Sequence, residues 1–223
     1  MASIALGLRP NNSFKPRPSA RLSSGVMHFR NETQQRERRV TEALASPGFL
    51  QMDLLRELRI ESPPLIAREL DKSLYGRNGD VDLVFATGWN TDAERLYAVE
   101  VKVMVLDGGG HFRSEKLNKH NKQLQQLRGE GWHYVYLLDV IVTQPAQSWF
   151  HPNAFEGFDN YRKEVIDQCV GHIVLQINAI AHKPETEAGS FAFHQVHPAI
   201  ENMRGGQSIN EIRNALSLVW ERA

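Results

Sequence analysis

Two short stretches of the sequence place acidic side chains and a lysine where they could act together on a metal ion. Residues 79–85 read Gly-Asp-Val-Asp-Leu-Val-Phe, and residues 97–103 read Tyr-Ala-Val-Glu-Val-Lys-Val. Both stretches alternate with period two, which predicts two half-buried β-strands. If these strands pair as a hairpin, one surface of the sheet collects the charged side chains Asp80, Asp82, Glu100 and Lys102. Carboxylates held close together repel each other, so a divalent cation or the lysine ammonium must compensate their charge.

The types of these side chains indicate the chemistry. Oxygen ligands alone favour a hard cation, which predicts Mg²⁺ as the cofactor, with Mn²⁺ as a substitute. Lys102 follows Glu100 by two positions and shares its face of the strand. Its ammonium could polarise a water molecule or meet a phosphate as a point charge, which fits metal-assisted hydrolysis of a phosphodiester bond. The alternative interpretation is an ordinary solvated ion pair between Glu100 and Lys102 on a surface strand.

The run of residues 79–84 followed by residues 99–102 resembles the motif of the PD-(D/E)XK nuclease superfamily, which includes restriction endonucleases and Holliday-junction resolvases. The resemblance implies a metal ion held by the side chains of Asp82 and Glu100 and by the carbonyl of Val101. It also implies that Lys102 positions or activates the attacking water.

This sequence departs from the superfamily pattern at one position. Val81 stands where many members have a proline before the aspartate, so either Asp80 or Asp82 could be the ligand. The resemblance implies Asp82, because the run of glycine, acid, apolar residue, aspartate and apolar residue is the commoner form in the resolvase-like members. The resemblance further implies one more acid from the first core helix, for which Glu42 and Glu57 are the candidates and Glu42 is preferred.

The order of the predicted elements extends the resemblance beyond the motif. Hydrophobic periodicity and turn residues predict helices at 31–45, 49–58 and 114–128, and strands at 64–75, 79–85, 97–103 and 132–142. The last strand is apolar on both faces, which is typical of the centre of a mixed sheet. We therefore expect an α/β fold with a restriction-endonuclease-like core: a helix, a three-strand meander, a helix and a strand around a mixed sheet flanked by helices.

The helix at 114–128 carries more basic and amide side chains than acids. In the resembling families this helix flanks the active site, which implies that Gln123 takes part in catalysis and that nucleic acid is contacted by Lys116, Lys119 and Lys122. Gln123 and Lys116 border the apolar stripe and are the preferred residues to reach inward. The alternative interpretation is an ordinary solvated helix face.

The rest of the chain suggests a single domain with a basic arm. Residues 1–26 are rich in proline, asparagine and serine, and their basic residues have no acids among them, which predicts either a flexible arm that tracks a phosphate backbone or a solvated tail. We expect one nuclease-like domain at 27–223, with a core at about 31–145 and a C-terminal extension at about 146–223. The extension could enlarge the sheet or mediate a homodimer.

Composition narrows the possible classes of protein. The chain has 223 residues, a formal net charge of zero and one cysteine, Cys169, which excludes an internal disulfide and a multi-cysteine zinc site. No run is long enough for a membrane helix, and a cytoplasmic protein without membrane contact is expected. The main hypothesis is a Mg²⁺-dependent endonuclease or exonuclease whose substrate is nucleic acid, preferably DNA. The alternative is a non-catalytic module on the same fold that binds nucleic acid or protein.

Overall fold

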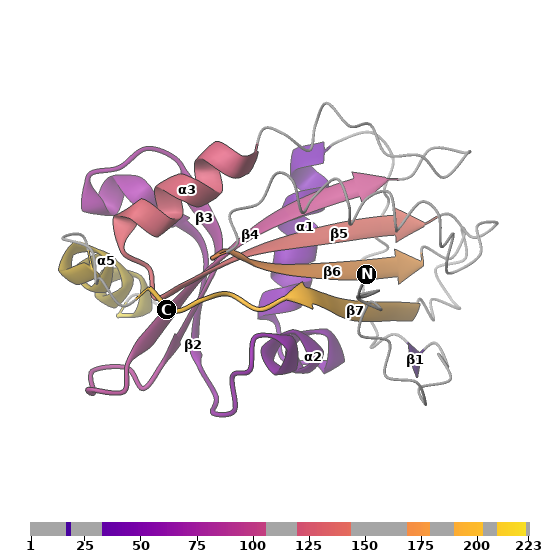
Figure 1. The fold of residues 1–223 in the computed structure, drawn as a ribbon, viewed down its shortest axis with the longest axis horizontal. Coiled ribbons are helices and arrows are strands. Elements are labelled where there is room, and N and C mark those ends of the chain that lie inside the picture. Colours follow the sequence, from indigo (N-terminus) through magenta and orange to yellow (C-terminus); the bar gives the residue numbers. More distant parts are fainter. Residues whose placement is uncertain are drawn as a thin grey trace, which may run out of the picture.

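A mixed β-sheet runs through the centre of the protein and carries helices on both faces (Figure 1). The computed structural model describes residues 17–18, 33–105, 120–143, 169–178, 190–202 and 209–221. The strands are β1 (Arg17–Pro18), β2 (Leu65–Asp71), β3 (Asp80–Thr87), β4 (Arg95–Val105), β5 (Tyr134–Thr143), β6 (Gly171–Asn178) and β7 (Ser190–His197). The helices are α1 (Thr33–Ala45), α2 (Phe49–Glu57), the 3-10 helix η1 (Lys72–Tyr75), α3 (Asn121–Glu130) and α5 (Ile209–Trp220).

The strand order of the sheet is β1-β7-β6-β5-β4-β3-β2. Strands β2, β3 and β4 form an antiparallel meander, and β4, β5 and β6 run parallel to one another. The sequence of helix, three strands, helix and strand confirms the predicted α/β core. Strand β5 lies between β4 and β6, as its apolar faces predicted.

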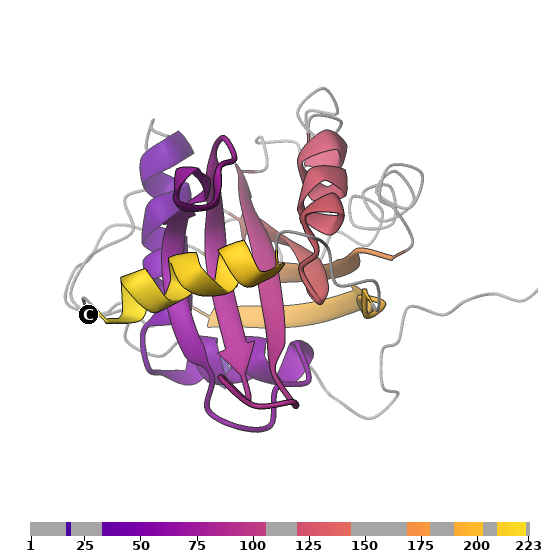
Figure 2. The ribbon, with the colours of Figure 1, turned by 90° about the vertical axis from the view of Figure 1, so that its left-hand side faces the viewer.

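Two hydrophobic clusters fill the space between the sheet and the helices. The α1 face of the sheet is defined by its contact with α1 and α2, whose buried side chains include Val40, Leu44 and Leu54. The α3 face packs against α3 and α5 through Leu124, Leu127, Ile212 and Leu216. Figure 2 shows α5 lying across the strands of the meander on this second face. None of the described helices is long and apolar enough to cross a membrane.

The structure corrects the predicted first strand, which ends earlier than the alternating pattern suggested. Strand β2 stops at Asp71, because the Asp71 carboxylate accepts a hydrogen bond of 2.8 Å from the Ser73 N–H and starts the helix η1. Gly76, with φ at 74°, ends that helix in the left-handed conformation that glycine adopts without steric cost. As predicted, Gly131 ends α3.

Several predictions fall outside the described residues. They are the basic arm at 1–26 except for Arg17 and Pro18, most of the first half of the helix at 114–128, and the connection at 144–168.

A fully buried ion pair joins η1 to the end of α3. The Lys72 ammonium lies 2.7 Å from Glu130 Oε1, and both side chains are 3% exposed. The carboxylate also accepts hydrogen bonds from the Tyr75 hydroxyl, the Trp132 indole and the Gln126 amide. Charge and hydrogen-bonding capacity are therefore matched within this cluster, as burial requires.

We expect Lys72→Met to destabilise the protein by about 3 kcal/mol, because the substitution leaves the Glu130 carboxylate buried without a cation. The matched control is Arg56→Met, which removes the partner of Asp53 from an exposed ion pair and should cost less than about 1 kcal/mol. Urea unfolding of both variants measures the difference. Equal losses in the two variants would contradict the structural role assigned to Lys72.

Candidate functional site

Strands β3 and β4 separate part way along their length. Their ladder runs from Thr87 opposite Arg95 to Leu83 opposite Val99, and no pair follows. Strand β4 nevertheless continues to Val105, because β5 pairs with it over its whole remaining length. The backbone of β4 beyond Val99 thus faces a gap, and we call this gap the fork.

The Asp82 side chain occupies the fork. Its Oδ2 accepts a hydrogen bond of 2.7 Å from the Val101 N–H, which a β3 carbonyl would receive if the ladder continued. The Lys102 ammonium lies 3.8 Å from Asp82 Oδ2 and 2.5 Å from Glu100 Oε1. The structure therefore brings Asp82, Glu100 and Lys102 together, whereas Asp80 is exposed at the start of β3, opposite Asp71.

Burial controls the electrostatics of the fork. Burial and the neighbouring Asp82 carboxylate raise the pKa of Glu100 from 4.5 to about 7. Burial also raises the pKa of Asp82, although Lys102 and the Val101 N–H oppose the shift. Burial by itself lowers the pKa of Lys102, but the attraction of Glu100 and Asp82 outweighs it, and the net pKa is raised. Lys102 is therefore a cation at neutral pH, while Glu100 exchanges its proton near that pH.

One oxygen of the fork has an unused binding capacity. Glu100 is 1% exposed, and its Oε2 is buried without a hydrogen-bond partner. Without a metal ion, a protonated Glu100 reduces the cost of this burial by sharing its proton with Asp82 in a side-chain hydrogen bond, and a bound cation would take the place of that proton. Among the described residues, no three Asp, Glu, His or Cys side chains are grouped closely enough to hold a metal ion. The donor set that fits a divalent cation here is thus two carboxylates and main-chain oxygen.

The acid of α1 whose charge acts on the fork is Glu37, which the sequence analysis did not select. The Glu37 carboxylate is one of the charges that raise the pKa of Lys102. Glu42 instead lies 3.6 Å from Arg68 in an ion pair whose acidic side chain is 62% exposed. The sequence does contain a signal for Glu37. It lies three, four and seven positions before Val40, Thr41 and Leu44, which are buried, and this spacing places all four side chains on one side of α1.

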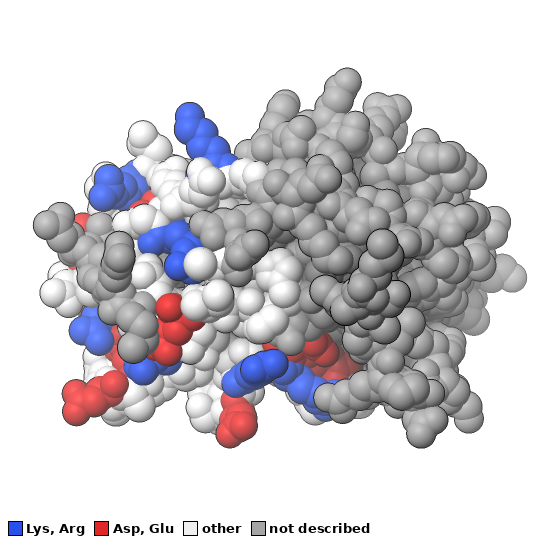
Figure 3. Space-filling view, in the orientation of Figure 1, with Lys and Arg blue, Asp and Glu red and all other residues white. Residues whose placement is uncertain are grey.

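The structure describes only part of the predicted substrate-facing set on α3. Gln123 is half-buried on α3, and in the part of the chain that the structure describes it makes no hydrogen bond to Asp82, Glu100 or Lys102. Lys122 is exposed on the same helix, while Lys116 and Lys119 are not among the described residues. Figure 3 shows basic and acidic side chains interspersed over the described part of one face.

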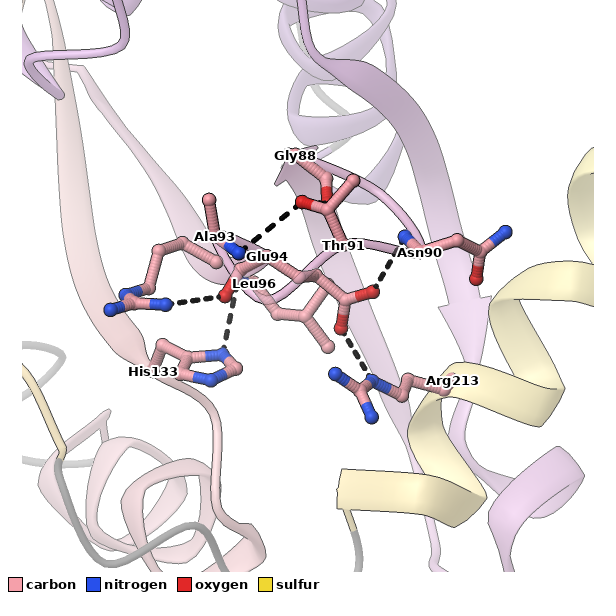
Figure 4. Close-up of polar contacts among 9 residues, drawn as sticks. Gly88, Asn90, Thr91, Ala93, Glu94, Leu96, His133 and Arg213 are labelled. Carbon is pink, nitrogen blue, oxygen red and sulfur yellow. Dashed lines mark hydrogen bonds and ion pairs between the residues drawn. The ribbon is translucent and has the colours of Figure 1, made fainter.

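The Glu94 carboxylate and the His133 imidazole, which lie outside the fork, have matched partners. Asn121 Oδ1, at the start of α3, is buried without a hydrogen-bond partner. At the hairpin end of β3 and β4, the Glu94 carboxylate accepts from the Asn90 N–H at 3.1 Å and pairs with Arg213 of α5 (Figure 4). His133 Nδ1 accepts from the Leu96 N–H at 3.0 Å (Figure 4). These contacts fasten α5 and the start of β5 to the hairpin.

A second matched pair lies beside the fork on the same sheet. Asp139 stands in register with Lys102 across β4 and β5. Its Oδ2 lies 2.8 Å from Nε2 of His172, and both side chains are buried.

We expect the fork to make the metal-free protein less stable as the pH rises. Because the folded pKa of Glu100 is raised, its contribution to stability is fully present below pH 4.5 and is lost as the pH rises through about 7. Glu100→Gln cannot ionise, so its stability relative to the wild type should increase over this range. Urea unfolding of both proteins in EDTA, between about pH 5 and 8, measures this difference. A constant difference across that range would contradict the raised pKa.

Comparisons with known proteins give one distant likeness. No protein-family model matches the sequence, and no curated protein matches it. Among solved structures, the chain is similar to Pyrococcus furiosus SfsA, determined in complex with Ca²⁺, at 13% sequence identity and a TM-score of 0.37. The match covers 76% of this chain and 65% of the SfsA chain, so this chain spans less than two thirds of the length of SfsA. A likeness this remote supports no statement about activity.

Proposed function

We propose that this protein is a metal-dependent nuclease that hydrolyses phosphodiester bonds, with DNA as its preferred substrate. The observation that carries the proposal is the fork, where two carboxylates and an ammonium meet and a buried carboxylate oxygen of Glu100 has no hydrogen-bond partner. The proposal also rests on the resemblance of residues 79–84 and 99–102 to the PD-(D/E)XK motif.

The side chains of Asp82 and Glu100 would hold the metal ion. The Val101 carbonyl is the third candidate ligand, because the N–H and C=O of one strand residue point to the same side, and the Val101 N–H points to Asp82. When bound, Mg²⁺ or Mn²⁺ would polarise the scissile phosphate and lower the pKa of a bound water molecule.

Lys102 has a different role from the acids. Its raised pKa keeps the side chain protonated at neutral pH, so it cannot take a proton from the attacking water. The ammonium would instead hold the water or a phosphate oxygen in place and stabilise negative charge that develops on the phosphate. Glu37 would keep the ammonium charged and oriented toward the fork.

Contacts to the phosphate backbone would supply affinity without reading sequence. The candidates for these contacts are Lys116, Lys119 and Lys122, with Gln123 nearer to the reacting phosphate, and the basic residues within 1–26. Because the net charge is zero, this binding depends on where the basic residues lie and not on the charge of the whole chain.

A non-catalytic binding module is the second candidate, and one observation favours it. The Lys102 ammonium already lies 2.5 Å from Glu100 Oε1, so the site is partly neutralised without any metal. Calorimetric titration with Mn²⁺ separates the two functions. A nuclease should bind Mn²⁺ at a site that Asp82→Ala removes, whereas a binding module should show no such site.

We expect Asp82→Asn, Glu100→Gln and Lys102→Met each to reduce Mg²⁺-dependent cleavage by about a hundredfold or more, because each removes a ligand or a charge at the reacting phosphate. Cleavage is measured separately on supercoiled DNA, linear DNA, single-stranded DNA and RNA, each in the presence of either Mg²⁺ or EDTA. Thermal unfolding confirms that each variant is folded. Unchanged cleavage in all three folded variants would refute the proposed function.

The two acids of α1 give a second, matched comparison. Glu37→Gln should lower cleavage by about tenfold, because it removes a charge that orients Lys102, while Glu42→Gln should leave cleavage unchanged. Both substitutions change the same helix by one charge, so a general effect on α1 would appear in both variants. Equal losses, or a loss confined to Glu42→Gln, would exclude the role given to Glu37.

A further inference from the structure

Glu69 has an unusual backbone conformation for a residue inside a β-strand. Its φ is 48°, in the left-handed region that a residue with a Cβ enters only at a steric cost. The other described non-glycine residues with positive φ are Arg59 and Asn90, and neither belongs to a strand. Glu69 lies near the middle of β2, which is an edge strand of the sheet.

In β2 and β3, the alternation of side chains between the two faces of the sheet is broken at the level of Glu69. Side chains that are three positions apart on a regular strand point to opposite faces. In β2, however, Ala67 and Leu70 both pack on the α3 face, and in β3 Val81 and Val84 do the same. Leu83, next to Asp82, packs on the α1 face. The period-two alternation that the sequence predicted for residues 79–85 is therefore broken at Asp82.

The register of the ladder locates the reversal. Arg68 lies opposite Leu83, and Leu70 lies opposite Val81, so the position between these two pairs would match Glu69 with Asp82. That match is missing from the ladder. Asp82 is therefore the β3 residue that faces the left-handed turn of β2.

The same reversal explains why the fork opens. With regular alternation, β3 would continue its ladder beyond Leu83 and would place a main-chain carbonyl against β4. The ladder between β3 and β4 instead stops at Leu83, and the Asp82 carboxylate takes the Val101 N–H at 2.7 Å.

We propose that Glu69 is a positioning residue whose left-handed backbone turns β3 away from β4 and so places the Asp82 carboxylate in the fork. The effect passes through the backbone and not through the Glu69 side chain. Among the described residues, the one interaction of that side chain is an ion pair with Arg38 at 3.5 Å, in which both side chains are exposed. Burial of Leu70 and Val81 on the α3 face favours the turn and offsets its steric cost. The consequence for metal binding rests on the proposed function, whereas the placement of Asp82 does not.

The test compares Glu69→Gly with Glu69→Val, and Glu69→Ala is the control. All three variants lack the carboxylate and the ion pair with Arg38. Glycine adopts positive φ without steric cost, alanine keeps the Cβ of the wild-type residue, and the β-branched valine disfavours positive φ most. The readout is hydrogen exchange of the Val101 amide in the metal-free protein, measured by NMR. This amide is protected by Asp82, while the Leu138 amide in the central strand β5 reports global opening.

We expect Glu69→Gly and Glu69→Ala to keep wild-type protection of Val101, and Glu69→Val to exchange this amide roughly fivefold faster or more, with Leu138 unchanged in all three. Arg38→Gln should behave as wild type, because it removes only the ion pair. If Glu69→Val protects Val101 as well as Glu69→Gly does, the positioning role is refuted. Faster exchange in Glu69→Gly and Glu69→Ala would also refute it, because the side chain would then be responsible.

Titration with Mn²⁺ provides the second readout. Affinity should follow the same order, with Glu69→Gly and Glu69→Ala equal to wild type and Glu69→Val weaker. A wild-type protein that binds no Mn²⁺ would count against the proposed function, while exchange of the Val101 amide would still decide the role of Glu69.

Discussion

Two carboxylates share one ammonium in a site that is largely removed from water, and the functional interpretation of the protein depends on this imbalance. Asp82 and Glu100 repel each other, and Lys102 can neutralise only one negative charge. The protein accommodates the excess by raising the pKa of Glu100 to about 7. A divalent cation would satisfy the same site by supplying the missing positive charge.

Two other buried carboxylates in the described part of the chain have a full set of partners, which distinguishes them from the acids of the fork. Lys72 and Glu130 are paired one to one, and the remaining capacity of the carboxylate is taken by three neutral donors. Glu94 likewise has Arg213 and a main-chain donor. These clusters are complete within the folded chain and need nothing from outside. At the fork, by contrast, Glu100 Oε2 is left without a donor.

The scaffold holds the fork open from both sides. Pairing with β5 keeps β4 straight beyond Val99, so the strand does not collapse toward β3 when their ladder ends. Packing of α1 and α2 on one face and of α3 and α5 on the other buries the strands on each side of the gap. A site placed on buried strands keeps its ligands in position better than a site built on loops.

The sequence by itself determined the type and order of the core elements and the residues that meet in the fork. Alternation with period two and turn residues are local signals, so β3, β4 and β5 could be assigned from neighbouring residues alone. The spacing of Glu100 and Lys102 follows from the geometry of any strand.

Only the tertiary structure decided which acid of α1 approaches Lys102, because that depends on how the helix is rotated against β4. Helical spacing places Glu37 on the same side of α1 as Val40 and Leu44, but it does not show which strand that side faces. The left-handed backbone of Glu69 and the burial of Lys72 also had no local signal. A left-handed backbone and a buried ammonium are both unfavourable in an isolated segment. Pairing of β2 with β3, which includes Val81, stabilises the backbone of Glu69, and the ion pair with Glu130 stabilises the buried Lys72.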